Sequence, residues 1–269
     1  GPPWPDNACM ATSAGELLYE RRGSTAVITF NRPEAHNAMT FAMYDELHDR
    51  CDEVDADDDV RVVVLRGAGG RAFVSGTDIR QFLEFESGEI GVEYEERIDR
   101  YVGRLERVRK PTIAQIDGYA VGSGLAMSAA CDLRICTPAA RFGLPIARTL
   151  GNCLSMAGYA RLVALLGPAR TKDIVFTARM VGADEALAAG LATEVVAPEE
   201  IDARVAELAE LMATHAPITM KATKEAIRRI REANLPDGSD LIAEAYGSED
   251  FRQGVAAFLD KRPPSFTGS

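Results

Sequence analysis

The chain has 269 residues, and its 30 Lys and Arg against 41 Asp and Glu give a formal net charge of −11. This acidity argues against a broad, sequence-independent hold on nucleic acid or on an anionic membrane surface. A hydrophobic content of 46% is ordinary for a globular protein, and no apolar stretch is long enough to cross a bilayer.

The cysteines and the N-terminal residues favour a cytoplasmic protein. The cysteines form an odd set with no C-x-x-C pair and no spacing typical of a zinc site: Cys9, Cys51, Cys131, Cys136 and Cys153. We therefore expect reduced thiols and no metal site. Residues 1–13 lack the basic and then apolar order of a signal peptide, and we expect them to form a flexible tail outside the fold.

The first part of the chain alternates strand and helix signals. Two apolar runs, 17–19 and 26–30, predict a β-hairpin across the turn Arg-Arg-Gly-Ser. Thr40 can cap a helix that runs to about residue 55, because apolar residues recur there at helical spacing. The β-branched run 60–65 predicts a strand that is buried on both faces.

Strand signals continue to about residue 142, and helical signals follow. Short apolar runs predict further strands at 72–74, 112–116, 133–136 and 140–142. A helical pattern covers 77–109 with a break at Ser87-Gly88, and small residues predict a helix over 125–131. From Gly151 onward the pattern is mainly helical. The sequence therefore predicts an α/β core followed by a helical C-terminal region.

Two glycine-containing segments, 72–79 and 116–124, come just before predicted helices. A helix N-terminus leaves N–H groups unpaired and carries partial positive charge, so each segment could bind an anion or a developing oxyanion. Two such N–H groups that converge on one carbonyl oxygen form an oxyanion hole. Taken alone, the same glycines are also explained by two tight turns.

Four motifs occur along the chain in a characteristic order. They are Asn-Arg-Pro-Glu-Ala-His-Asn-Ala-Met at 31–39, Phe-x-x-Gly-x-Asp at 73–78, Gly-x-Gly at 122–124 with Cys-Asp-Leu-Arg at 131–134, and Phe-Gly-Leu-Pro at 142–145. In this order they resemble the enoyl-CoA hydratase/isomerase (crotonase) superfamily. The resemblance covers about residues 15–266, which is nearly the whole chain.

This resemblance implies a fold and an assembly. It implies an α/β fold, a crotonase-like spiral of ββα units over residues 14–200 that forms the acyl-CoA-binding core. Residues 201–269 would be a helical C-terminal region for oligomerisation, typically as a homotrimer or a dimer of trimers.

The resemblance also implies an acyl-CoA substrate, with coenzyme A as part of that substrate and no separate cofactor. The thioester oxygen would bind two backbone N–H groups, which here belong to Thr77 and Ser123. These are the predicted catalytic residues, and the glycines around them are expected to shape the substrate pocket: Gly76, Gly122 and Gly124.

Hydratases of this family use two glutamates, at positions that correspond here to Ala126 and Ile146. Neither side chain can transfer a proton, so the two carboxylates that add water in family hydratases are absent at these positions. We therefore expect an enzyme of the acyl-CoA lyase or isomerase type that hydrates simple enoyl-CoA esters poorly. The alternative is a catalytically weak member that binds acyl-CoA for regulation or assembly.

Other side chains could supply the missing proton transfer. Glu84, Glu86 and Tyr94 lie in the region that often lines the acyl pocket of this family, with exposed surface as the alternative for each. Asp78 is expected to cap a helix. Asp132 is expected to anchor neighbouring backbone, because a partly buried carboxylate needs hydrogen-bond donors.

Cys153 follows Gly151-Asn152 and corresponds to the carboxylate nucleophile of family dehalogenases. A thiolate there would need a lowered pKa, which Arg148 could provide, and Arg148 could also contact the thioester. The alternatives are a buried core cysteine and a surface arginine.

Four residues correspond to family positions that approach coenzyme A: Arg32, His36, Phe258 and Lys261. Solvent exposure is the alternative for the charged ones. A different class of function, RNA binding, would need the basic stretch 221–231, which a solvated helix face also explains.

Overall fold

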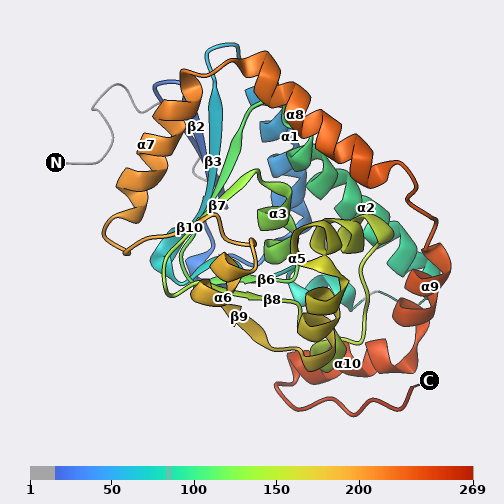
Figure 1. Ribbon diagram of the computed structural model, residues 1–269. Coiled ribbons are helices and arrows are strands. Elements are labelled where there is room, and N and C mark those ends of the chain that lie inside the picture. Colours follow the sequence, from blue (N-terminus) through green and yellow to red (C-terminus); the bar gives the residue numbers. More distant parts are fainter. Residues whose placement is uncertain (1–15, 84, 86, 269) are drawn as a thin grey trace.

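The larger of two sheets forms the centre of the computed structural model, which describes residues 16–83, 85 and 87–268 (Figure 1). In sheet order its strands are β1 (Leu17–Arg22), β2 (Thr25–Phe30), β3 (Val62–Gly67), β5 (Thr112–Ile116), β7 (Leu133–Cys136) and β10 (Glu194–Val195). The first two form the predicted antiparallel hairpin, and the others follow in parallel. The expected tail over residues 1–13 lies outside the described residues.

A smaller sheet contains β4 (Ala72–Val74), β6 (Tyr119–Val121), β8 (Arg141–Gly143) and β9 (Met180–Gly182) in that order. β4, β6 and β8 are parallel, and β9 pairs with β8 in the antiparallel sense. The chain runs from a strand of the larger sheet to a strand of the smaller one and then into a helix, and this unit repeats. The repeat confirms the predicted α/β fold of strand, strand and helix units.

Ten α-helices surround the two sheets in the described part of the chain. They are α1 (Phe41–Ala56), α2 (Gly88–Glu106), α3 (Ser123–Ala130), α4 (Ile146–Thr149), α5 (Met156–Thr177), α6 (Ala183–Ala188), α7 (Ile201–Ala213), α8 (Pro217–Glu232), α9 (Ser239–Gly247) and α10 (Glu249–Leu259). Thr40 caps α1 as predicted, since its hydroxyl accepts the N–H of Met43. None of the described helices is long and apolar enough to cross a lipid bilayer.

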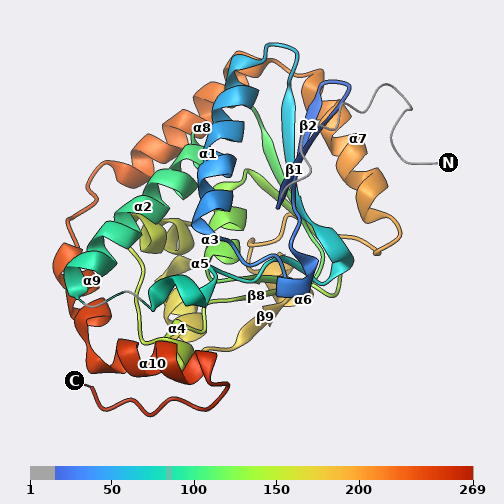
Figure 2. The ribbon, with the colours of Figure 1, turned by 180° about the vertical axis from the view of Figure 1, so that it is seen from behind.

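β3 is buried on both faces, as its β-branched sequence predicts. Val63 and Leu65 join the apolar core that also contains residues of α1, α2 and α3. Val62 and Val64 face the other way and pack with residues of α7, such as Val205. Figures 1 and 2 show α7 on one side of the larger sheet and α1 on the other.

Three short strands were not predicted, and each forms through pairing rather than local pattern. Residues 118–124 were expected to lead directly into a helix, but β6 forms there between β4 and β8. β9 and β10 lie in the region expected to be mainly helical. Strands of two or three residues carry too little periodicity to be recognised without their partners.

Asp132 anchors the start of β5, as predicted. Its Oδ2 accepts the backbone N–H of Thr112 at 2.7 Å and the Thr112 hydroxyl at 3.0 Å. The same oxygen pairs with Lys224 Nζ of α8 at 2.7 Å. The carboxylate therefore joins the start of β5 and the residue before β7 to α8.

The last two helices pack against α2 and the 3₁₀ helix η3 (Ile79–Phe82). Figure 2 shows α9 beside the N-terminal half of α2. Two glycines of α2 permit this approach, because a Cβ at Gly88 would overlap the backbone of Ala243 and a Cβ at Gly91 would overlap Tyr246. α7, α9 and α10 thus share apolar clusters with the rest of the chain, whereas α8 has no buried residue, and the part of this region in assembly remains a prediction.

Candidate active site

A cavity of about 510 Å³ brings together the two glycine loops, α2 and the C-terminal helix α10. Thr77 reaches it from the loop after β4, and Ser123 reaches it as the first residue of α3. Apolar side chains supply much of the remaining wall: Ile79, Phe82, Ile98, Leu144, Ile146, Leu150 and Leu154. The cavity therefore offers an apolar chamber with two backbone loops at its edge.

The two loops that line this cavity contain backbone N–H groups without an acceptor. Met39 N donates to Gly76 O and Asp78 N donates to Met39 O, both at 2.8 Å, which fixes the backbone on either side of Thr77. Gly122 N donates to Gly143 O at 3.0 Å and fixes the second loop. Within the described residues, neither Thr77 N nor Ser123 N has a hydrogen-bond acceptor. Two such donors beside one cavity can stabilise an oxyanion.

Glycine is required in both loops because the backbone takes positive φ there. Gly76 has φ 117° and Gly122 has φ 58°, and a side chain at either position would be strained. Ser123 begins the helix after Gly122, so a serine fits at this position. Gly124 does not line the cavity as predicted; a Cβ there would overlap the carbonyl of Val74, and this glycine lets α3 lie against β4.

Two buried tyrosines hold the Thr77 side chain. Its Oγ1 lies 2.9 Å from the Tyr44 hydroxyl and 2.8 Å from the Tyr94 hydroxyl. Burial raises the pKa of Tyr44 to about 12 and the pKa of Tyr94 well above its ordinary value. Tyr94 therefore lines the cavity as a neutral hydroxyl; the alternative of an exposed side chain is wrong for it, and a role as acid or base stays a prediction. The other two candidates, Glu84 and Glu86, lie outside the described residues.

Ser123 also has a side chain beside these tyrosines. Its Oγ is buried and lies close enough to Tyr44 to lower the pKa of that group, although no hydrogen bond of good geometry joins it to the described residues. The group of this residue that we consider for binding an oxyanion is the backbone N–H.

Ala126 and Ile146 both line the cavity, as predicted. Among the described residues, the carboxylates that line it are instead Asp78 and Glu95. Asp78 caps η3 as predicted, through a hydrogen bond from Arg80 N at 3.2 Å. The Arg80 guanidinium holds the pKa of Asp78 at about 2, and Asp78 is therefore ionised and committed to its neighbours near pH 7.

Glu95 of α2 was not predicted as a site residue, and it is only 4% exposed. Its Oε2 accepts the backbone N–H of Ser155 at 3.0 Å, and its Oε1 accepts the Tyr246 hydroxyl at 2.5 Å. Burial raises its pKa to about 7. The sequence signal was its place on the buried stripe of α2, four residues after Gly91 and three before Ile98.

The predicted contacts to coenzyme A divide into two groups. His36, Phe258 and Lys261 line the cavity, and Phe258 and Lys261 are exposed at its rim. Arg32 does not line it; its side chain is buried and turned inward, with Nη1 donating to Ala38 O at 2.6 Å and Nη2 lying 3.4 Å from Asp78. The structure thus uses Arg32 to hold the loop that carries His36.

Arg148 and Cys153 do not line the cavity, contrary to prediction. Arg148 is exposed, as its alternative proposed. Cys153 is half-buried and its Sγ lies 3.7 Å from Leu241 O. Burial raises the pKa of this thiol to about 12, so it is not a thiolate near neutral pH, and the packing interpretation holds.

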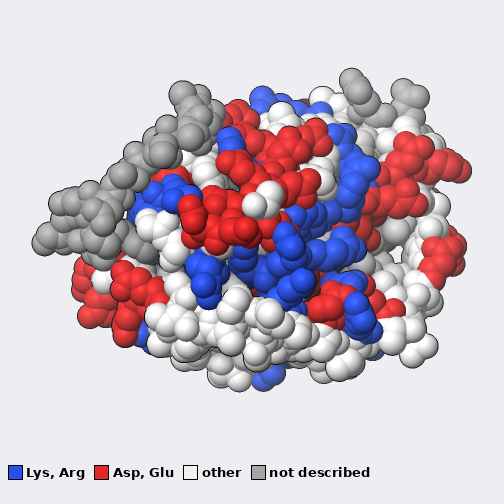
Figure 3. Space-filling model, turned by 90° about the horizontal axis from the view of Figure 1, so that it is seen from above, with Lys and Arg blue, Asp and Glu red and all other residues white. Residues whose placement is uncertain are grey.

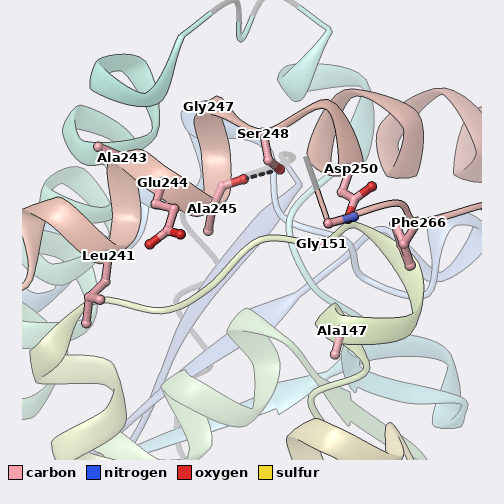
Figure 4. A pocket seen from close by; sticks show the side chains of 11 residues that line it. Ala147, Gly151, Leu241, Ala243, Glu244, Ala245, Gly247, Ser248, Asp250 and Phe266 are labelled. Carbon is pink, nitrogen blue, oxygen red and sulfur yellow. Dashed lines mark hydrogen bonds between the residues drawn. The ribbon is translucent and has the colours of Figure 1, made fainter.

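A second cavity, of about 620 Å³, lies between α9, α10 and the segment after α4 (Figure 4). Its acidic side chains are Glu244 and Asp250, and Asp250 already accepts the N–H groups of Thr267 and Gly268. None of the predicted site residues lines it. We therefore take the smaller cavity as the candidate active site.

The basic stretch 221–231 lies on α8, and four of its five basic residues form ion pairs. Ion pairs join Lys224 to Asp132, Arg228 and Arg229 to Glu225, and Arg231 to Glu106. Figure 3, which looks from above onto this side of the molecule, shows basic and acidic side chains next to one another. This arrangement favours an ion-paired helix face over a site for RNA.

Comparison with known proteins agrees with the motifs. The family model for enoyl-CoA hydratase/isomerase matches residues 20–269. The chain belongs to the enoyl-CoA hydratase/isomerase family. Over 250 residues it is 35% identical to a short-chain-enoyl-CoA hydratase of Clostridium acetobutylicum, with 91% of this chain and 95% of the relative covered.

Solved structures of this family show the same fold. An enoyl-CoA hydratase/carnithine racemase from Magnetospirillum magneticum is 31% identical, with a TM-score of 0.78 over 96% of this chain and 97% of that one. Methylmalonyl-CoA decarboxylase in complex with 2-nitronate-propionyl-CoA is 25% identical, with a TM-score of 0.87 over 96% of this chain and all of that one (100%). The family members with related folds therefore differ in the reactions that their names describe.

Proposed function

We propose that this family member binds an acyl-CoA thioester and stabilises negative charge on the thioester oxygen. The N–H groups of Thr77 and Ser123 would donate to that oxygen. The observation that carries this proposal is that both groups belong to residues lining one cavity and lack an acceptor among the described residues. Loss of one such donor costs about a hundred- to a thousandfold in rate.

The rim of the cavity fits the coenzyme A part of the substrate. His36, Phe258 and Lys261 lie there, and the Lys261 ammonium can pair with a phosphate. Relatives named for CoA esters support this assignment. We propose coenzyme A only as part of the substrate and no separate cofactor.

The reaction would be of the lyase or isomerase type and not efficient hydration of simple enoyl-CoA esters. Ala126 and Ile146 give the cavity apolar walls where we place the two acids of family hydratases. Asp78 is held by Arg80 and cannot replace one of them. Water addition would therefore lack its pair of carboxylates, whereas chemistry through an enolate needs one proton-transfer group.

The test is a panel of acyl-CoA esters measured for binding by calorimetry and for turnover by mass spectrometry. We expect binding of at least one ester, turnover of that ester, and crotonyl-CoA hydration far below the rate of an ordinary hydratase. Efficient hydration of crotonyl-CoA would contradict the assigned reaction type. Tight binding without turnover of any ester would favour the alternative, a binding or regulatory member.

We also propose that the chain assembles as a homotrimer or a dimer of trimers in the cytoplasm. α8 exposes apolar side chains that a partner subunit could cover, with Ile218 at 79%, Ile227 at 62% and Ile230 at 78% exposure. Cys51, Cys131, Cys136 and Cys153 are free thiols, which suits a reducing compartment. Sedimentation analysis that finds a monomer at micromolar concentration would contradict the assembly.

A further inference from the structure

We propose that Glu95 is the proton-transfer residue of this cavity, taking a proton from Cα of the bound acyl group and returning it. The proposal rests on the proposed function and deepens it by naming the catalytic acid and base. Its basis is the position of one buried carboxylate and the hydrogen bonds that orient it.

Glu95 lines the same cavity as Thr77 and Ser123. Each carboxylate oxygen accepts one hydrogen bond, from Ser155 N and from the Tyr246 hydroxyl. A carboxylate oxygen has two lone pairs, so one on each oxygen is left for a proton. The group is thus fixed in orientation and still able to react.

The direction of the Tyr246 hydroxyl follows from its other partner. Asn152 Nδ2 donates to Tyr246 Oη at 3.1 Å, so the tyrosine oxygen accepts there and its own proton goes to Glu95. Tyr246 reaches this position because α9 lies against Gly91 of α2. A residue of the C-terminal helices therefore positions a carboxylate of the core.

Basic side chains pair with two half-buried acids of α2, Asp99 and Glu106, but not with the buried Glu95. Glu106 pairs with Arg161 at 3.1 Å and with Arg231, and Asp99 lies 3.6 Å from Arg161. Glu95 forms no ion pair with a described basic residue. A buried carboxylate without a cationic partner costs stability, which is typical of a group kept for chemistry.

The groups that face Glu95 set its titration. Burial raises its pKa to about 7, the hydrogen bonds from Tyr246 and Ser155 lower it, and the charge of Asp99 raises it. The other titratable neighbours are neutral near pH 7 because burial raises their pKa values: Tyr44, Tyr94, Cys153 and Tyr159. Near pH 7 the carboxyl can therefore both accept and donate a proton.

The proposed step is balanced without a co-reactant. The Cα–H bond breaks, its proton goes to a Glu95 oxygen, and its electron pair forms the enolate double bond between Cα and the carbonyl carbon. The N–H groups of Thr77 and Ser123 hold the resulting oxyanion. Return of the proton to Cα exchanges the hydrogen, and its delivery to Cγ of a 3-enoyl ester moves the double bond.

Hydrogen exchange at Cα tests the step directly. Butyryl-CoA, 3-butenoyl-CoA and phenylacetyl-CoA are incubated with the protein in D₂O, and deuterium at Cα is followed by mass spectrometry. We expect exchange of at least one ester by the unaltered protein and a loss of about a hundredfold or more in Glu95→Gln, with little change in binding. The control is Glu96→Gln, since Glu96 is the adjacent and exposed glutamate of α2.

A second variant tests the positioning by Tyr246. Tyr246→Phe removes a hydrogen bond that lowers the pKa of Glu95, so the apparent pKa of exchange, near 7 in the unaltered protein, should move upward. If Tyr246 had only a structural role, this substitution would not change the apparent pKa of exchange. This readout does not depend on the folding of Glu95→Gln.

The outcomes separate the two proposals. If Glu95→Gln binds the esters and exchanges hydrogen at the wild-type rate, the assignment of Glu95 is overturned and the proposed function stays in place. The same conclusion follows if the unaltered protein binds esters without exchange. Failure to bind any of the esters overturns the proposed function, and with it the role of Glu95.

Discussion

Gly91 of α2 lies directly against the side chain of Tyr246 of α9, where a Cβ atom would overlap the tyrosine. Residues far apart in the sequence thus form the contact that brings the Tyr246 hydroxyl to Glu95, a residue that lines the cavity. We expect Gly91→Ala to displace α9 and to destabilise the fold by about 1–3 kcal/mol, because overpacking a well-filled contact forces side chains from their rotamers.

The matched control for this change is Gly103→Ala in the same helix, where a Cβ would meet only the flexible end of Arg107. Urea unfolding of both variants checks the expectation. Equal stabilities of the two variants would show that the approach of α9 to α2 needs no glycine.

The oxyanion donors are backbone groups, so an ordinary side-chain change cannot remove them. Ser123 is the first residue of α3, a position where proline is favoured, and Ser123→Pro deletes its N–H with little cost to the helix. We expect exchange at Cα of 3-butenoyl-CoA to fall about a hundred- to a thousandfold. Ser123→Ala keeps the N–H and should lose less than about tenfold; equal losses in both variants would place the effect in the hydroxyl.

Ala126 and Ile146 give a gain-of-function test. We expect the double variant Ala126→Glu/Ile146→Glu to hydrate crotonyl-CoA at least about a hundredfold faster than the parent chain, because both carboxylates would then line the cavity. Each single variant should fall well short, since water addition needs two groups. The decrease in ultraviolet absorbance of the enoyl group measures the rate of hydration. A parent chain that hydrates crotonyl-CoA as fast as the double variant does would contradict this expectation.

The raised pKa of Glu95 makes stability depend on pH. Between its ordinary value of 4.5 and about 7, the folded chain keeps a proton that the unfolded chain releases. This contribution to stability is therefore complete below about pH 4.5 and is lost as the pH rises through about 7. Relative to the unaltered protein, Glu95→Gln should gain on the order of 3 kcal/mol between pH 5 and pH 8, and a constant difference would contradict the shift.

Cys153 has a thiol whose pKa burial raises to about 12, outside the cavity. Cys153→Ala should therefore retain Cα exchange within about twofold of the unaltered protein, because no step uses a thiolate. A loss of activity comparable to that of Glu95→Gln would return this cysteine to the list of nucleophiles.

The parts of the site that depend on local motifs with fixed spacing could be predicted from the sequence. The parts that depend on contacts between distant segments could not. The loops of Thr77 and Ser123 are local devices, in which glycines at positive φ turn the backbone before a helix. Glu95 stands among Glu93 and Glu96 in a helix rich in charge, which resembles a solvated face. Its place on the apolar stripe of α2 is a weak sign of burial, and the packing of α9, which brings Tyr246 to it across 151 positions of sequence, decides the matter.

The partners of charged residues also could not be predicted where they lie far away in the sequence. The basic residues of 221–231 form a run in the sequence, yet their acidic partners include Asp132 and Glu106 from distant elements. Arg32 likewise appears available as a phosphate contact until the fold turns it toward Ala38 and Asp78. Charge balance in three dimensions could not be predicted from spacing along the chain.

Tyr246, which orients Glu95, and Phe258 and Lys261, which line the cavity, are the last of these residues to leave the ribosome. A nascent chain that has passed Ser155 already carries both oxyanion loops and Glu95, but without α9 the glutamate faces water. There it would ionise as an ordinary surface acid and lose the donor from Tyr246. An incomplete chain that ends before α9 would therefore lack the Tyr246 donor to Glu95 as well as Phe258 and Lys261, so both proton transfer and CoA binding would wait for the C-terminal helices.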